Sequence, residues 1–228
     1  MKQNIFKKLL SYITEIHIES VQSDYNESLQ VFLKNGRYQL CTTNAIYSYA
    51  DKYDNFKESF DLLNLETPEV KNVLLLGFGL GSIPFMLEKV FGKKYTYTGV
   101  EIDEAVIYLA SRYVMDELDS EIELVQADAY AFINQNHITY DLICIDIFVD
   151  DKIPELFLTE DFLQLVSDNL SKNGFILFNH LAFYKSDKIA ADEYYEDIFI
   201  HIFPEATSLN VNKNRMMVSD KSRILKQQ

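Results

Sequence analysis

A run of apolar residues that ends in three closely spaced glycines limits most strongly how this chain can fold. Residues 73–76 are all Val or Leu, and Gly77, Gly79 and Gly81 follow within five residues. A helical pattern then covers residues 82–90. Glycines at a strand-to-helix turn let a ligand approach the bare backbone at a helix N-terminus. The sequence therefore predicts an α/β sheet in which this strand leads into a ligand-binding turn.

A carboxylate follows the next predicted strand. Residues 95–100 have the pattern of a strand, and Glu101 comes directly after them. In α/β sheets that bind nucleosides, an acid at this strand tip accepts hydrogen bonds from the ribose hydroxyls. The nicotinamide fingerprint places its third glycine five positions after the first, but here Gly81 comes four positions after Gly77. We therefore expect a nucleoside cofactor other than a nicotinamide dinucleotide.

Asp128 follows the third predicted strand, residues 121–126. Its carboxylate can accept a hydrogen bond from the amino group of adenine, and it can equally cap the helix that begins at residue 129. These two roles do not exclude one another, so both remain open.

Strands and helices alternate along the rest of the chain, which is typical of a doubly wound sheet. The predicted strands are 72–77, 95–101, 121–126, 140–146 and 174–180, and the predicted helices are 82–91, 103–116, 129–135, 159–171 and 186–201. Residues 207–211 and 215–219 predict an antiparallel C-terminal hairpin. The expected fold is a Rossmann-like seven-stranded methyltransferase fold, in which a parallel sheet ends in an antiparallel hairpin.

A smaller unit precedes this sheet. Asn35-Gly36 lies between two strand-like runs, which is a strong hairpin signal. Residues 56–65 have a helical pattern. We therefore predict a small N-terminal helix and β-hairpin region over residues 1–66 and a cofactor-binding domain over residues 67–228.

Several acids are expected at the ligand edge of the sheet. The fourth strand ends in Asp146, and Asp150 and Asp151 lie in the loop that follows. Clustered carboxylates repel one another, which raises some of their pKa values and makes a proton acceptor for an amine plausible. The alternative is a solvated acidic loop. His180, at the end of the fifth strand, is a further candidate for substrate contact, although a single histidine is usually structural.

Composition narrows the range of partners. Acidic residues outnumber basic ones 35 to 21, and the net charge is -14. Such a surface repels nucleic acid and attracts cationic small molecules. The only two cysteines, Cys41 and Cys144, predict neither a disulfide framework nor a metal site. We find no apolar stretch long enough for a signal peptide or a membrane span, so a cytoplasmic protein is expected. The oligomeric state stays open, with a homodimer among the alternatives.

Five segments together resemble spermidine synthase and its methyltransferase-like relatives. They are residues 73–81, 100–103, 126–129, 140–146 and 158–162, so the resemblance covers most of the chain. It implies S-adenosylmethionine, or its decarboxylated form, as cofactor. By this resemblance, the glycines hold the methionine part, Glu101 with Ile102 the ribose, and Asp128 with Ala129 the adenine. Asp146 stands where the family has its catalytic base.

The chain also departs from the synthase pattern. Synthases carry D-S-S-D-P-x-G-P after the fourth strand, and here Val149 stands at the second aspartate. Aligning their Y-H-E with residues 56–58 leaves only Glu58 in common, with Phe56 and Lys57 in the other two positions. Tyr47 takes the place of a glutamine, and Leu80 that of an aspartate. Together with Asp150, Asp151 and His180, we treat Tyr47 and Glu58 as candidates for substrate contact.

These departures favour a cofactor-dependent methyltransferase that acts on a small acceptor, which can be an amine. Aminopropyl transfer to a polyamine is the first alternative, and a cofactor-binding protein without catalysis is the second. Despite the resemblance, efficient synthesis of spermidine is not expected, because apolar groups and a lysine replace the partners of a diamine.

Overall fold

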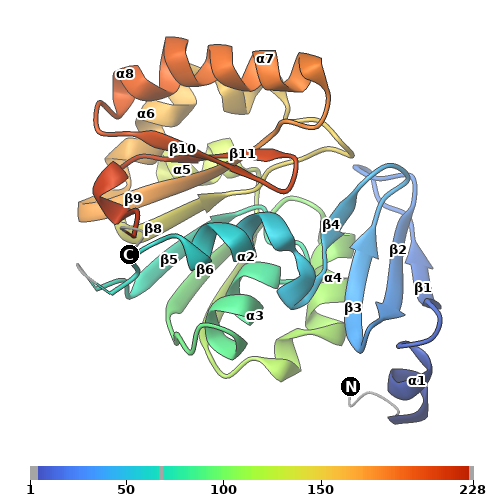
Figure 1. Ribbon diagram of the computed structural model, residues 1–228. Coiled ribbons are helices and arrows are strands. Elements are labelled where there is room, and N and C mark those ends of the chain that lie inside the picture. Colours follow the sequence, from blue (N-terminus) through green and yellow to red (C-terminus); the bar gives the residue numbers. More distant parts are fainter. Residues whose placement is uncertain (1–4, 67–68, 226–228) are drawn as a thin grey trace.

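The computed structural model describes residues 5–66 and 69–225. It contains a small antiparallel sheet and a large sheet with helices on both faces (Figure 1). Within these residues, no helix is both long enough and apolar enough to cross a lipid bilayer.

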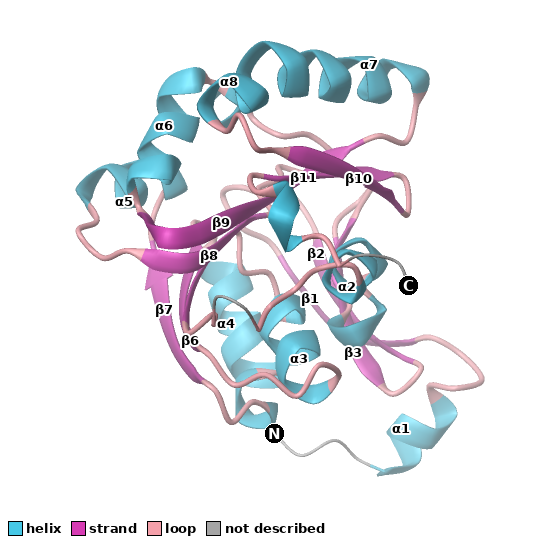
Figure 2. Cartoon of the chain, turned by 60° about the vertical axis from the view of Figure 1, so that its left-hand side comes forward, coloured by secondary structure: helices cyan, strands magenta, loops and turns pink. Residues whose placement is uncertain are grey.

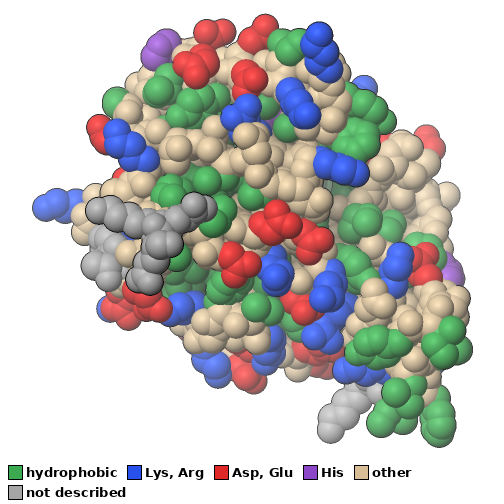
Figure 3. Space-filling view, viewed as in Figure 1, with side chains coloured by type: hydrophobic (Ala, Val, Ile, Leu, Met, Phe, Trp, Pro, Cys, Tyr) green, Lys and Arg blue, Asp and Glu red, His purple; other side chains and the backbone are tan. Residues whose placement is uncertain are grey.

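The small sheet has four antiparallel strands, one after another in chain order. They are β1 (Ile16–Val21), β2 (Leu29–Lys34), β3 (Arg37–Cys41) and β4 (Ile46–Ser48). The predicted hairpin is its centre: Lys34 pairs with Arg37, and Asn35 and Gly36 between them both have positive φ. Such a turn matches the twist of the strands. Before the sheet, α1 (Ile5–Leu10) carries exposed apolar side chains, which gather at the lower right of Figure 3.

The large sheet has seven strands in the order β10-β11-β9-β8-β5-β6-β7. β5 to β9 are parallel, and β11 and β10 complete the sheet in antiparallel orientation. The bounds are β5 (Asn72–Leu76), β6 (Thr96–Glu101), β7 (Glu121–Gln126), β8 (Tyr140–Ile145), β9 (Leu170–Leu181), β10 (Thr207–Val211) and β11 (Asn214–Val218). The predicted seven-stranded sheet with its C-terminal hairpin is confirmed.

Helices cover the two faces of this sheet (Figure 2). The helices of one face are α2 (Asp54–Asp61), α3 (Ser82–Lys89) and α4 (Glu104–Tyr113), and those of the other are α5 (Ala129–Gln135), α6 (Glu160–Asp168), α7 (Lys185–Tyr194) and α8 (Ile200–Ile202). Successive strand residues point to opposite faces. Leu75, Cys144 and Leu177 accordingly pack toward α2 to α4, whereas Ile145 and Phe178 pack toward α5 to α7.

The structure corrects two predicted boundaries. Helix α6 ends at Asp168 and β9 begins at Leu170, so the helix predicted over 159–171 was too long. Leu170 already pairs with Tyr140 of β8, and the register then shifts before Phe175 pairs with Leu142. The bulge explains why the sequence pattern did not reveal the early start of the strand.

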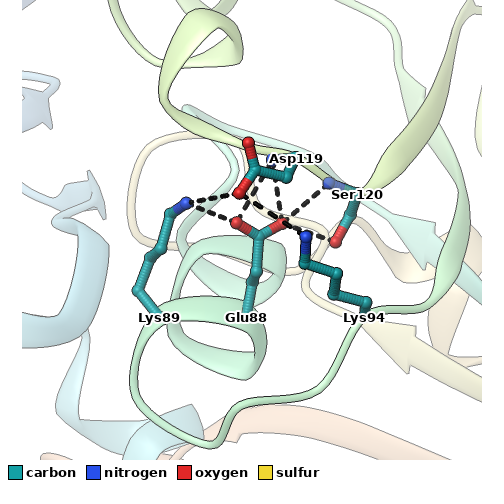
Figure 4. Close-up of polar contacts among 5 residues, drawn as sticks. All are labelled: Glu88, Lys89, Lys94, Asp119 and Ser120. Carbon is teal, nitrogen blue, oxygen red and sulfur yellow. Dashed lines mark hydrogen bonds and ion pairs between the residues drawn. The ribbon is translucent and has the colours of Figure 1, made fainter.

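A buried acid holds α3 against the beginning of β7. Glu88 accepts hydrogen bonds from the backbone amides of Asp119 and Ser120 and from the Ser120 hydroxyl (Figure 4). Lys89 forms an ion pair with both Glu88 and Asp119, and Lys94 forms another with Asp119. Burial alone raises the pKa of Glu88, but the hydrogen bonds from Lys89, Ser120 and the backbone outweigh it and lower the pKa to about 2.

We expect Glu88→Gln to lower the free energy of unfolding at pH 7 by about 1 to 3 kcal/mol, because an amide cannot replace a carboxylate as acceptor of all these bonds. The pKa of Glu88 is depressed in the folded state, so its contribution is complete above about pH 4.5 and is lost as the pH falls toward 2. Denaturant unfolding of both proteins at several pH values measures this. A difference that stays constant from pH 7 down to pH 3 would contradict the assignment.

The first glycine of the triplet allows two strands to approach closely. Gly77 has a φ of 87°, and a Cβ at this position would lie 2.2 Å from the carbonyl oxygen of Asp146. The Asp146 amide donates to the carbonyl of Leu76 at 2.8 Å. Only glycine at position 77 therefore allows the carboxyl ends of β5 and β8 to lie this close together.

Gly77→Ala should lower the free energy of unfolding by about 2 kcal/mol more than Gly92→Ala does. Both glycines have positive φ, but a Cβ on Gly92 would meet no atom within 4 Å. Gly92→Ala thus measures the backbone strain alone, and the difference between the variants measures the clash with Asp146. Denaturant unfolding gives both values, and equal losses would show that the close approach is absent.

Candidate functional site

A cavity of about 1050 Å³ lies at the carboxyl ends of β5, β6 and β8, where open α/β sheets bind ligands. Both sheets contribute to its walls. The large sheet provides Gly77, Glu101 and Asp146, and the small sheet with its loops provides Asn26 and Tyr47. The cavity is thus built between the two predicted regions of the chain.

Glu101 holds the glycine turn. One carboxylate oxygen accepts hydrogen bonds from the amides of Phe78 and Gly79, each at 3.2 Å, and the other accepts from the amide of Asp103 at 3.2 Å. Burial raises the pKa of this carboxyl, and the three amides act in the opposite direction. The carboxylate lines the cavity, where it can also accept hydrogen bonds from a ligand.

The other predicted cofactor residues gather nearby, with one exception. Ile102, Asp128 and Ala129 line the cavity beside Glu101. Asp128 also caps α5 by accepting from the amide of Ala131 at 2.9 Å, which was one of its two expected roles. Gly81 caps α3 with a φ of 74° but is not among the residues that line the cavity.

Loops of the small sheet close over this part of the cavity. Asp103 accepts hydrogen bonds from the Ser23 hydroxyl at 2.5 Å and from the Asn26 amide at 2.9 Å. Tyr47 donates to Asn26 and accepts from the backbone amide of Asp150. Two different loops of the large sheet are therefore tied to the small one.

Asp146 lies beyond the glycine turn and receives two neutral donors. Its Oδ1 accepts from Asn179 Nδ2 at 2.8 Å and from the Tyr53 hydroxyl at 3.2 Å. Burial is the main cause that raises the pKa of Asp146 to about 6, and the charge of Glu101 adds to it. A carboxylate with this pKa can accept a proton near neutral pH.

Tyr53 corrects the alignment made from the sequence. That alignment put Phe56 at the position of the synthases' tyrosine and so predicted that the hydroxyl is missing. In the structure Phe56 is fully buried in the core, whereas Tyr53, three residues earlier, brings a hydroxyl to Asp146. The sequence argument missed Tyr53 because it aligned the Y-H-E motif by residue type alone. The position of Tyr53 depends on the turn that precedes α2, which the sequence does not reveal.

The remaining acids of the loop after β8 differ in their surroundings. Asp150 accepts from the Thr42 hydroxyl at 2.6 Å and from the side chain and backbone of Asn44, and these bonds lower its pKa. Asp151 is exposed and lines the cavity. Tyr47 lines it too, and burial raises its pKa to about 12. Asp150 is therefore occupied in holding the small sheet, and Asp151 has the freer carboxylate.

Two predicted contact residues lie outside the cavity lining. Glu58 is exposed on α2. His180 points to the opposite face of β9 from Asn179, where its ring lies near Tyr194 of α7 and burial lowers its pKa. The prediction that His180 lies near the ligand edge holds for its backbone but not for its side chain, because strand residues alternate between faces.

Most departures from the synthase pattern also lie away from the cavity. Leu80 is buried beside Phe85 and Arg37, and Lys57 pairs with Asp61 on α2. Of the substituted positions that the sequence argument held against a diamine, Val149 alone lines the cavity. The argument from Phe56, Lys57 and Leu80 was therefore wrong about where these residues lie.

The cavity wall is acidic. Eight carboxylates and three lysines line it: Asp54, Glu101, Asp103, Asp128, Asp146, Asp150, Asp151, Asp187, Lys52, Lys152 and Lys213. Such a wall attracts cations. No group of three or more potential ligand side chains in the described residues could hold a metal ion.

Comparison with protein families adds the decisive observation. The model of the spermine/spermidine synthase domain matches residues 60–218, more than two thirds of the chain. The chain belongs to this family. The resemblance seen in the sequence is thereby confirmed. The matched residues include all seven strands of the large sheet.

Individual relatives agree with the family. A polyamine aminopropyltransferase from Vibrio vulnificus is 30% identical over 118 residues, which are 50% of this chain and 39% of that protein. The chain thus spans about two fifths of that relative's length. A probable spermidine synthase from Corynebacterium glutamicum has the same fold, with a TM-score of 0.71 at 13% identity over 88% of this chain and 78% of the other. Human methyltransferase-like protein 13, solved in complex with SAH, shares the fold with a TM-score of 0.58 at 20% identity over 71% of this chain and 78% of the other.

Asp146→Asn should stabilise the folded protein above pH 6. The pKa of Asp146 is raised from 3.8 to about 6 on folding, so ionising this half-buried carboxyl opposes folding. The gain in unfolding free energy should be about 3 kcal/mol at pH 8 and should disappear below about pH 4, where both states are protonated. Denaturant unfolding across this pH range measures it. A variant that is less stable at pH 8 would contradict the raised pKa.

Proposed function

We propose that the protein transfers an aminopropyl group from decarboxylated S-adenosylmethionine to an amine acceptor. The observation that carries the proposal is the Asp146 carboxylate, which lies in an acidic cavity between the glycine turn and the Tyr53 hydroxyl. Methyl transfer was the first expectation from the sequence. The comparisons do not support it, because the matching family and the curated relative are named for aminopropyl transfer to polyamines.

The residues present fit this nucleoside. Decarboxylated S-adenosylmethionine carries a sulfonium and an ammonium, and the cavity offers carboxylates at both Glu101 and Asp146. The Glu101 carboxylate, which accepts hydrogen bonds from three backbone amides, would also accept from the ribose hydroxyls. Asp128 with Ala129 would contact the adenine. Gly77 and Gly79 line the same cavity, and the ammonium of the aminopropyl chain would make a favourable charge contact with the acidic wall.

The sulfonium supplies an activated carbon, so the chain's own residues mainly orient the acceptor and remove its proton. In one displacement, the acceptor nitrogen bonds to the methylene attached to the sulfonium sulfur, the bond between that carbon and sulfur breaks, methylthioadenosine leaves with the electron pair, and the proton of the acceptor nitrogen passes to Asp146. Tyr53 and Asn179 both donate to Oδ1 of Asp146. The second oxygen, Oδ2, is thereby left to accept the proton.

The acidic wall suits a cationic acceptor. The protonated far end of a linear polyamine loses its hydration in the cavity and needs a carboxylate to compensate. Asp54, Asp151 and Asp187 line the cavity and remain accessible. A di- or polyamine is therefore the acceptor class that we propose.

The test is release of methylthioadenosine from decarboxylated S-adenosylmethionine in the presence of putrescine, cadaverine or spermidine. We expect turnover with at least one of these amines. Asp146→Asn should lower kcat by about 10²-fold or more, the usual contribution of a positioned general base. Tyr53→Phe should lower it less.

The matched control is Asp197→Asn, the same chemical change at an exposed position of the π-helical segment after α7. Its turnover should equal that of the unmodified protein. Methylation of an amine from S-adenosylmethionine, without methylthioadenosine release from the decarboxylated form, would overturn the proposal.

A further inference from the structure

Three neighbouring strands bring polar residues to one face of the sheet beside the cavity. Ile145 pairs with Phe178 across β8 and β9, so Asp146 and Asn179 are the next residues along the two strands. Asn179 in turn pairs with Met216 of β11, and Asn214 lies two residues before Met216. Residues two apart on a strand share a face. Asp146, Asn179 and Asn214 therefore form a row across the sheet.

Two hydrogen bonds join this row. Asn214 Nδ2 donates to Asn179 Oδ1 at 2.7 Å, and Asn179 Nδ2 donates to Asp146 Oδ1 at 2.8 Å. Asn179 is 1% exposed, so water does not offer it another partner. An ionised carboxylate only accepts, which directs Asn179 Nδ2 toward Asp146 and its Oδ1 toward Asn214. The donor at position 214 thus completes one consistent orientation of the row.

The orientation has a consequence for Asp146. An Asn179 amide that is fixed with Nδ2 toward Asp146 stabilises the carboxylate more than the protonated acid, because it cannot accept a hydrogen bond from the acid proton. An amide that is free to turn can present Oδ1 and accept from the protonated acid as well. Fixing the amide therefore favours the ionised form of Asp146, the form that can accept a proton.

The position of Asn214 is fixed by the tight turn between β10 and β11. Val211 pairs with Asn214, and the two residues between them, Asn212 and Lys213, have φ values of 38° and 69°. A lysine in this region is strained, and such strain persists where the surroundings demand the conformation. The amide of Ala182 donates to the carbonyl of Lys213 at 2.9 Å and anchors the turn to the end of β9.

We propose that Asn214 is a positioning residue, which fixes the Asn179 amide so that it donates to the carboxylate of Asp146. The orientation of Asn179 follows from the hydrogen bonds of the row, whatever reaction the protein catalyses. The role of Asn214 in proton transfer rests on the proposed aminopropyl transfer.

Other groups face Asp146 and must be considered in any titration. Tyr53 approaches from the segment before α2, Glu101 from β6, and Cys144 from β8 itself. β9 and β11 contribute the two asparagines, and β5 contributes only the backbone of Gly77. Further charges on the cavity wall are Lys52, Asp54, Asp103, Asp128, Asp150, Asp151, Lys152, Asp187 and Lys213.

The experiment measures the pKa of the Asp146 carboxyl by NMR of protein labelled with ¹³C in its aspartate carboxyls. Asp146→Asn identifies the resonance. Asn214→Leu removes the donor without adding charge and should raise the pKa by about half a unit, because the freed amide can serve the protonated acid. Asn214→Asp keeps the shape but accepts from Asn179, which turns Oδ1 toward Asp146, and should raise the pKa by about one unit or more.

The matched control is Asn210→Asp, the same change at an exposed position on the same hairpin. It adds the same charge outside the row and should leave the pKa of Asp146 within about 0.2 units. An unchanged pKa in Asn214→Leu, or equal shifts in Asn214→Asp and Asn210→Asp, would overturn the proposal. If the leucine variant does not fold, Asn214→Ala, which also removes the donor without adding a charge, replaces it, and an unchanged pKa in that variant would overturn the proposal.

Activity provides a second measurement. Asp146 must be ionised to accept a proton, so a higher pKa moves the acidic limb of the profile of kcat/KM against pH to higher pH. Asn214→Asp should shift this limb by the same amount as the NMR pKa. If no variant transfers an aminopropyl group, the proposed function fails, while the NMR titration still decides the role of Asn214.

Discussion

A half-buried carboxylate whose hydrogen-bond donors in the described chain are neutral is the constraint on which the site depends. Burial makes the charged form of Asp146 costly, and a lysine or arginine partner would remove that cost together with the basicity. In the described chain, its hydrogen-bond partners are an amide and a phenol. This arrangement keeps the pKa near neutral pH, so that the group can be ionised and can still accept a proton.

The alternation of side chains along the strands explains how this site and the core coexist. Alternate residues of β8 and β9 enter the two apolar layers, and the first residues that reach the cavity continue the same alternation. Asn179 therefore faces Asp146, whereas His180 packs against Tyr194 under α7. The start of α2 limits how much of this face is covered. The helix begins directly after Tyr53, and Tyr53 itself lies at the cavity beside the strand ends.

The sequence was sufficient for the sheet, the C-terminal hairpin and the strand tips that carry Glu101, Asp128 and Asp146, because these follow from local periodicity and glycine positions. It was not sufficient for Tyr53, Asn179 and Asn214. Their contacts depend on register between strands that are distant in the chain and on the turn before α2, and neither leaves a local pattern. The alternation of side chains along a strand could have identified Asn179, rather than His180, as the neighbour of Asp146, had the pairing of β8 with β9 been assumed.

The segment recognised as the family domain begins at residue 60, yet Asn26, Tyr47 and Tyr53 all precede it. The wall that carries Glu101 and Asp146 and the wall that faces it are thus encoded in separate stretches of the gene. Substitutions before residue 60 can reshape the facing wall while the backbone hydrogen bonds between the strands of the large sheet stay as they are. The wall that faces the large sheet can therefore be changed in the N-terminal quarter of the chain, while the hydrogen bonds that Asn179 and Asn214 contribute to the row at Asp146 depend on β9 and β11.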